Sequence, residues 1–212
     1  IAESVSLSLK HANNCMRAYQ PLSGFHKDAV QLWSDFGLSL TIFADTETQK
    51  GQSVSGGCLN QIGLSADRVS VLTSDRLDKE SREFKEPLKD LIEIIHAVED
   101  ALRARSDASN AVQRAAEAYK SRKEKLDSMR GKSTDEKIAV LEEETSNLLK
   151  AETESEVQLA KITEEVFREF DRFQEGKQQT IKKLAQSFVR IQLHHAQKMC
   201  SSWQTAADNM EN

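Results

Sequence analysis

The residues with the clearest chemical potential are cations gathered in the stretch YKSRKEKLDSMRGK, residues 119–132. Their side chains can bind phosphate or carboxylate groups, although the chain as a whole carries a formal net charge of -5. A solvated helix end would explain one such cluster. A second basic block without any acidic residue lies at residues 176–200, and a strongly acidic block at residues 138–175 separates the two. Two separated basic blocks on an acidic chain indicate a large anionic partner.

A membrane surface and a nucleic acid are the two anionic partners to compare. Each Lys or Arg close to an anionic membrane contributes roughly 1 kcal/mol, within a Debye length of the surface. Nucleic acid fits less well, because the basic segments lack interleaved aromatic side chains for base stacking. We therefore expect an anionic membrane and no nucleic acid as partner. The expected membrane contacts are Arg114, Lys120, Arg122, Lys123, Lys125, Arg130, Lys132, Lys177, Lys182, Lys183 and Arg190.

No set of side chains has the spacing of a catalytic or metal site. His194 and His195 are adjacent, so on a helix they point about 100° apart and are poor joint ligands. His195 falls on an apolar stripe and is expected to be a hydrogen-bonded histidine in a helix seam. Cys15, Cys58 and Cys200 are expected to be reduced, mostly buried thiols of a cytosolic protein. We expect no enzymatic activity, no cofactor and no metal.

Long helices must position these cations. The composition is rich in charged residues (30%) and poor in Gly (8) and Pro (2), which is typical of helices rather than strands. Between residues 138 and 210, steps of three or four residues meet an apolar side chain at most positions, which predicts one very long helix. Such a helix needs partner helices to bury its stripe. Trp33 and Trp203 both fall on apolar stripes and are expected in the core of a bundle.

The chain divides into residues 1–20, a linker or short amphipathic helix ended by Pro21, and a domain at residues 21–212. The domain's helices are expected at about 22–74, 75–130 and 134–210. Three glycines in residues 45–57 indicate that the first helix is broken or bulged there.

Two further signals concern the second helix and its end. Pro87 lies inside an apolar pattern that continues in phase on both sides, which predicts a bend rather than a helix end. Gly131 is a candidate helix C-cap, and Ser133 with Glu136 forms a capping-box pattern. A short turn and an antiparallel helical hairpin follow from this spacing.

The stretch EPLKDLIEIIHAVEDALRAR (residues 86–105) contains an E-P-L element followed by V-x-x-x-L-x-x-R. In both features it resembles the BAR domain of sorting nexins. Residues 166–204 carry a similar E-x-x-R-F-x-x-x-K pattern, with an aromatic residue about 30 residues later, and FGLSLTIFADTE (residues 36–47) is similar to the family's first helix. The matching positions are Glu86, Pro87, Leu88, Val98, Leu102, Arg105, Glu169, Arg172, Phe173, Lys177 and Trp203.

The resemblance implies an all-α fold, an elongated antiparallel three-helix coiled coil that forms a curved dimer around a central six-helix bundle. The basic hairpin turn would be the tip of each arm. At the end of the domain away from the basic hairpin turn, the expected apolar surface is larger than three helices can cover. This excess also favours a dimer. The expected dimer interface contains Phe25, Trp33, Phe36, Leu40, Phe43, Ile94, Ile95, Phe188 and Trp203.

The resemblance also implies a function: sensing membrane curvature and forming tubules on endosomes, in endosomal sorting and retrograde cargo retrieval. The implied partners are a phosphoinositide-containing membrane, a second identical chain or a related sorting nexin, and retromer-type coat subunits. The implied location is cytoplasmic, peripheral on endosomal membranes, with a phosphoinositide-binding PX domain before the BAR domain. The alternative is a structural coiled-coil rod or tether that does not bind membranes directly.

Overall fold

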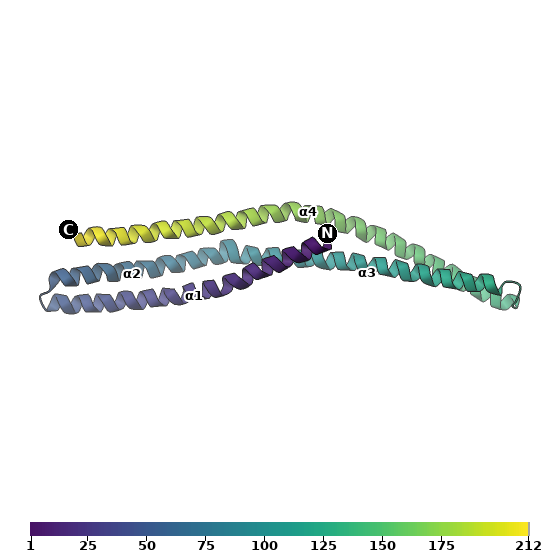
Figure 1. Ribbon diagram of the computed structural model, residues 1–212, viewed down its shortest axis with the longest axis horizontal. Helices are drawn as coiled ribbons and strands as arrows, with labels where there is room; N and C mark the ends of the chain where they lie inside the picture. Colours follow the sequence, from purple (N-terminus) through teal and green to yellow (C-terminus); the bar gives the residue numbers. More distant parts are fainter. Residues whose placement is uncertain (212) are drawn as a thin grey trace. The chain divides into compact units, whose positions relative to one another are not determined.

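The computed structural model of the protein describes residues 1–211, and helices make up nearly all of them (Figure 1). These are α1 (Ala2–Gln49), α2 (Ser53–Glu80), α3 (Glu86–Met129) and α4 (Asp135–Glu211), with one π-helical turn, η1 (Ser81–Lys85), between α2 and α3. No strand occurs in the described part of the chain. Because α2, η1 and α3 follow one another without a gap, residues 1–211 form three continuous helical segments. The all-α expectation is confirmed.

The chain divides into two compact units. Unit 1 consists of Ile1–Leu7 and Ile94–Gly176, and unit 2 consists of Ser8–Glu93 with residues 177–211. Unit 1 is therefore mostly the hairpin of α3 and α4, whereas α1, α2 and the second half of α4 form a three-helix bundle in unit 2 (Figure 1).

Close approach of α1 and α2 holds unit 2 together. A Cβ atom on Gly63 would lie 2.9 Å from the carbonyl oxygen of Gly37, so the two backbones meet at a point where only glycine fits. Ala66 and Val69, on the same part of α2, are completely buried. The Ser70 hydroxyl donates a hydrogen bond across to α1, to the carbonyl oxygen of Val30 at 2.8 Å. Small residues at the crossing thus give the bundle its tight packing.

The hairpin in unit 1 has a narrower core. Ile95, Leu126, Leu141 and Phe173 are its large buried apolar side chains. Arg105 reaches from α3 to α4, where its Nε donates to the Thr163 hydroxyl at 3.1 Å. A two-helix seam of this kind leaves most charged side chains in water, which suits a segment that presents cations.

The first helix ends earlier than the sequence pattern predicted. It stops at Gln49, and the chain reverses through Gly51, whose φ of +82° lies in the left-handed region that favours glycine. The expected break in residues 45–57 is therefore a complete helix end, whereas the boundary expected at residues 74 and 75 is wrong. Asp75 lies well inside α2, where neither Gly nor Pro interrupts the helix.

Pro21 does not end a separate segment, contrary to the expectation for residues 1–20. The helix α1 continues through it from Ala2 to Gln49. Pro21 and Arg17, whose carbonyl oxygen loses its usual donor, are both exposed, so water can satisfy that oxygen. Buried Val5, Leu9 and Tyr19 keep the first part of α1 packed against the rest of the chain.

The helix also continues through Pro87, as the sequence predicted, and its hydrogen bonding changes just before that residue. In η1 the N–H of Glu86 donates to the carbonyl oxygen of Ser81, five residues back instead of four. Proline has no N–H and its ring crowds the carbonyl group of Glu83, so a wider turn relieves both conflicts.

The cysteines are more exposed than expected. Cys15 and Cys200 are exposed and Cys58 is partly buried, and all three are free thiols. The expectation of mostly buried thiols is therefore wrong for two of the three, because both lie on outward faces of long helices.

Candidate membrane-binding site

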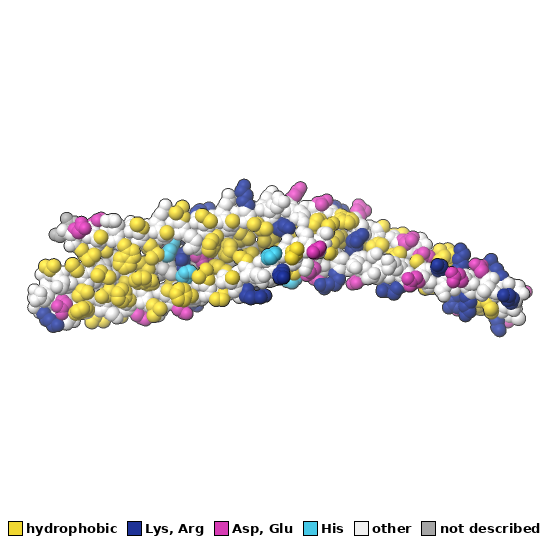
Figure 2. All heavy atoms as spheres, in the orientation of Figure 1, with side chains coloured by type: hydrophobic (Ala, Val, Ile, Leu, Met, Phe, Trp, Pro, Cys, Tyr) yellow, Lys and Arg dark blue, Asp and Glu magenta, His cyan; other side chains and the backbone are white. Residues whose placement is uncertain are grey.

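The hairpin turn between α3 and α4 brings the first basic block together. α3 ends at Met129, Gly131 has a φ of +77°, and α4 begins at Asp135. The glycine at the helix C-cap is as expected. The capping box expected from Ser133 and Glu136 is not the start of the helix: the N–H of Ile138 donates to the carbonyl oxygen of Thr134 at 3.1 Å, which makes Thr134 the N-cap residue. Lys and Arg side chains gather around this turn (Figure 2).

Two of the cations at the turn are engaged by carboxylates. Arg122 pairs with Glu144 across the hairpin at 3.1 Å, and Arg130 pairs with Glu142 at 3.3 Å and with Asp127 at 3.7 Å. Exposed pairs of this kind contribute about 0–1 kcal/mol each to stability. They also lower the positive charge that these two arginines offer to a ligand.

The lysines of the same block are available. Lys120, Lys123, Lys125 and Lys132 are exposed, and none forms an ion pair within residues 1–211. The Lys123 ammonium lies 5.7 Å from the centre of the Tyr119 ring, a contact that leaves its outer face in water. The expected contact Arg114 is likewise exposed. These lysines form the strongest candidate surface for an anionic partner, and we call the four of them the tip lysines.

The second basic block is less uniform than the sequence indicated. Lys182 and Lys183 are exposed, with no ion pair to any described residue. Lys177 is partly buried and its ammonium lies 3.5 Å from the Ser8 hydroxyl. Arg190 is tied to Glu83 at 2.8 Å and also donates to Ser187. Of the four residues expected to contact a membrane here, two are thus freely presented.

Unit 2 also presents an apolar stripe along α1. Phe25, Leu32, Phe36 and Phe43 are between 48% and 70% exposed and recur at intervals of four or seven residues. Hydrophobic side chains cover a broad part of the visible face of unit 2 (Figure 2). A folded chain rarely leaves so many large apolar side chains in water unless another surface covers them.

Other residues expected at a dimer interface lie differently. Trp33 and Trp203 are partly buried and contact each other, with ring centres 6.1 Å apart, as expected for core aromatic residues. Phe188 and Leu40 are also partly buried, and Ile94 is 52% exposed. Ile95 is only 1% exposed and is buried within its own chain, so we leave it out of the proposed interface.

A buried polar cluster in unit 2 escaped the sequence analysis. The Glu80 carboxylate, 2% exposed, lies 3.3 Å from the Arg76 guanidinium and accepts hydrogen bonds from Tyr19 at 3.1 Å and from Gln192. Arg76 is 8% exposed, and its Nε and one terminal nitrogen have no hydrogen-bond acceptor in the described residues. Arg76 and Glu80 follow Val69 at helical spacing on the same buried face of α2. This spacing was the signal in the sequence that could have predicted their burial.

Two histidines lie close to this cluster. The Nε2 of His195 is 3.4 Å from the Thr73 hydroxyl, which confirms the expectation of a histidine with a polar partner in the seam. Burial lowers the pKa of His195, and the positive charge of Arg76 lowers it further. Burial and Arg76 lower the pKa of His26 in the same order. Burial is also the main cause that raises the pKa of the Tyr19 phenol.

The described residues contain no cluster of three or more His, Cys, Asp or Glu side chains placed to hold a metal ion. Within the same residues, no helix is long and apolar enough to cross a bilayer.

Comparisons with known proteins identify the family and the fold. Residues 14–209 match the family model described as Vps5 C terminal like. No curated protein matches the chain. The crystal structure of the Hof1p F-BAR domain is similar, with 12% identity, a TM-score of 0.51, and coverage of 98% of this chain and 82% of that chain.

Two further solved structures match at lower TM-scores. A BAR protein from Galdieria sulphuraria shares 15% identity over 99% of this chain and 94% of that chain, with a TM-score of 0.46. The I-BAR domain of D. Discoideum IBARa shares 16% identity over 98% of this chain and 88% of that chain, with a TM-score of 0.44. Since the family match covers nearly the whole chain and the Hof1p structure shares its helical arrangement, this chain belongs to the Vps5 C-terminal-like family and has a BAR fold.

Proposed function

We propose that this chain binds anionic membranes as a curved dimer and senses or imposes their curvature. The observation that carries the proposal is the set of tip lysines, exposed and unpaired at a turn where no packing function requires them. The BAR fold supports it, because a membrane scaffold needs such a surface rather than a catalytic site.

The expected strength follows from the number of free cations. Four lysines at roughly 1 kcal/mol each would give a weak attraction per chain, and a second chain would double it. Arg122 and Arg130 add less, since their partners Glu144 and Glu142 compete with lipid phosphates. Binding should therefore be measurable and strongly dependent on salt.

The dimer is supported by the exposed stripe on α1. Phe25 is 70% exposed and Leu32 67% exposed, and burial of such side chains contributes about 1.5–3 kcal/mol each. A second copy of the chain, or a related sorting nexin, would cover them. A closed two-fold arrangement buries the same stripe on both chains.

The finer assignment rests on the sequence resemblance. The similarity of residues 86–105 and 166–204 to sorting nexins supports a role in endosomal sorting and retrograde retrieval. It also supports recognition of phosphoinositide-containing membranes, association with retromer-type coat subunits, and a cytoplasmic location, peripheral on endosomes.

Vesicle co-sedimentation at low and high salt tests the proposal. Lys123→Glu together with Lys125→Glu should greatly reduce pelleting with phosphatidylserine vesicles at low salt, because two attractive charges become repulsive. The matched control is Lys150→Glu with Lys161→Glu, two exposed lysines of the same unit outside the basic block. The control has the same change in net charge and should reduce binding less.

A rod or tether without direct membrane contact would behave differently. The unmodified chain would not pellet with anionic vesicles at either salt concentration. Equal losses in the two double variants would show that net charge alone matters, and would contradict a binding surface at the hairpin turn.

A further inference from the structure

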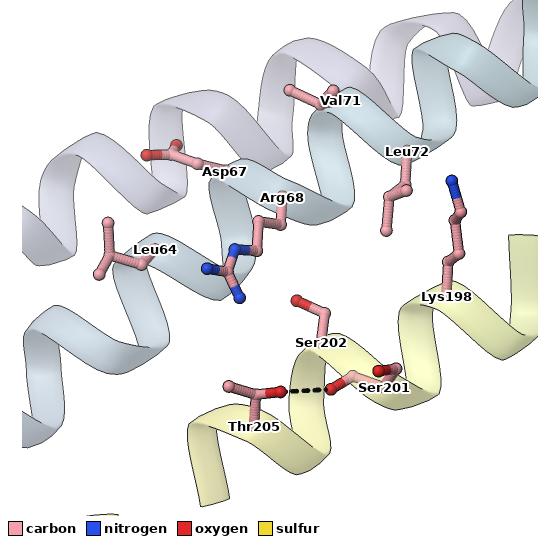
Figure 3. Close-up of a pocket in the computed structure, with 9 residues that line it drawn as sticks. All are labelled: Leu64, Asp67, Arg68, Val71, Leu72, Lys198, Ser201, Ser202 and Thr205. Atoms are coloured by element: carbon pink, nitrogen blue, oxygen red, sulfur yellow. Dashed lines mark hydrogen bonds between the residues drawn. The ribbon is translucent and has the colours of Figure 1, made fainter. Parts of the chain in front are cut away.

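A groove between α2 and α4 in unit 2 has features that neither the tip lysines nor the α1 stripe explain. Its volume is about 490 Å³, and Figure 3 shows residues of both helices that line it. Nine residues line it, and three on each helix recur at intervals of four and three, so each helix contributes one face. These six are Leu64, Arg68 and Val71 on α2, and Lys198, Ser202 and Thr205 on α4; Asp67, Leu72 and Ser201 lie next to them.

Polar groups without partners lie along this groove. Arg68 and Lys198 are exposed, and neither has an ion pair within residues 1–211. Ser202 is 6% exposed, and its buried Oγ has no hydrogen-bond partner among the described residues. The Arg68 guanidinium and the Ser202 hydroxyl extend toward the same space (Figure 3). A buried hydroxyl in this state is costly unless a ligand or water bonds to it.

Among the described residues that line the groove, Asp67 carries the one carboxylate, and it forms no ion pair with Arg68 or Lys198. Asp75 lines a neighbouring cavity together with Lys198, also without an ion pair to it. Asp67 points toward α1, where its Oδ1 fills the space next to Gly37 (Figure 3). The groove therefore favours a negatively charged group.

Apolar side chains form a large part of the remaining lining of the groove. Leu64 is 44% exposed and Val71 61% exposed, and Leu72 lies between the two helices. A lipid phosphate would bond to the cations but leave these side chains uncovered. A helix with an apolar stripe and carboxylates beside it would satisfy both kinds of group. The small side chains of Ser201, Ser202 and Thr205 allow such a helix to approach α4 closely.

We propose that this groove binds an amphipathic helix of another protein, with acidic side chains that contact Arg68 and Lys198. The spacing on both helices matches the repeat of a third helix packed along them. The proposal does not depend on membrane binding, since these residues are distinct from the tip lysines.

The test uses the whole chain and a fluorescent helical peptide about three heptads long, with leucines along one face and glutamates beside them. Fluorescence anisotropy should show saturable binding, and a peptide with lysine in place of glutamate should bind much more weakly. Arg68→Glu with Lys198→Glu should weaken binding of the acidic peptide at least about tenfold, because two attractive contacts become repulsive.

A matched control separates the groove from general attraction. Lys10 and Lys27 are exposed lysines on α1 of the same unit, and their double replacement by glutamate should change affinity by less than about threefold. Helical content from circular dichroism verifies folding of each variant. Should the glutamate variant unfold, Arg68→Gln with Lys198→Gln should still weaken binding. Equal affinity for the two peptides, or equal losses in variant and control, would overturn the proposal.

Two other occupants give different results. If the Arg68 and Lys198 variant has a lower molar mass in light scattering than the unmodified chain, the groove is a contact between copies. If that variant loses vesicle binding while peptide affinity stays unchanged, the groove holds lipid phosphate. Either result would also overturn the proposal, and neither bears on the tip lysines.

Discussion

Replacing Glu80 by Gln should destabilise the protein far more than an ordinary surface substitution. Glu80 is 2% exposed and its carboxylate forms an ion pair with Nε of Arg76 at 3.3 Å. Arg76 is itself 8% exposed, and this contact lacks the geometry of a hydrogen bond, so Nε and one terminal nitrogen have no hydrogen-bond acceptor among the described residues. Glutamine keeps the size and can still bond to Tyr19 and Gln192, but it leaves a buried guanidinium without a counter-charge. Removing one partner of a buried ion pair costs about 3–5 kcal/mol, which is the expected loss in the free energy of unfolding.

A second substitution should restore most of that loss. When Arg76→Met is combined with Glu80→Gln, no unpaired charge remains in the core, and the double variant should be within about 1–2 kcal/mol of the unmodified protein. The exposed pair Lys89–Glu93 has the same spacing of four residues and serves as control. Glu93→Gln should change stability by less than about 1 kcal/mol.

Urea unfolding followed by circular dichroism measures these differences at one fixed protein concentration, since self-association would make stability depend on concentration. Unequal slopes of the unfolding transition would show a change other than stability. A loss below about 1 kcal/mol for Glu80→Gln would refute the reasoning, as would a double variant no more stable than the single one.

Two other predictions concern acidity and assembly. Because burial and Arg76 lower the pKa of His26 and His195 in the folded protein, the unfolded chain binds protons more readily. Stability should therefore be fully present above the unfolded histidine pKa of about 6.5 and fall as the pH drops below it, and His195→Gln should reduce this dependence in urea unfolding at several pH values. A pH dependence unchanged in His195→Gln would exclude this origin. Light scattering at micromolar concentration should give the mass of a dimer, and Phe25→Glu with Phe36→Glu should lower it. A stable folded monomer of the unmodified chain would contradict the proposed dimer.

The regular parts of the fold could be predicted from the sequence because apolar residues repeat at helical spacing over long stretches. The continuous helix after residue 134 and the turn at Gly131 follow from such local signals. The position of the turn between α1 and α2 could not be predicted in this way, because the sequence alone does not distinguish Gly51 from Gly56 and Gly57 as the residue at the turn. Packing decides among them: Gly56 is buried beside the carbonyl oxygen of Ala44, whereas Gly51 adopts a positive φ.

The candidate site was only partly predictable for a similar reason. Charge blocks reveal where cations are concentrated, but not which of them find a carboxylate on a neighbouring helix. Arg190 was expected to face a ligand and instead pairs with Glu83, more than one hundred positions away in the chain. Lys198 belonged to the same block, yet its place beside Arg68 depends on how α2 packs against α4. Contacts between distant segments decide these cases.

The π-helical turn at Ser81–Lys85 has a consequence for how the chain tolerates changes in length. A bond that spans five residues accommodates one residue more than an α-helical turn would, without rotating the helix beyond it. In α2, deleting one residue would turn every later side chain of the continuous helix by about 100° and remove Leu88 and Leu91 from the core. Within η1 the same deletion would convert the turn to ordinary α-helix and preserve both buried faces. This short segment is thus where the second long helix can lose a residue at the least cost in stability.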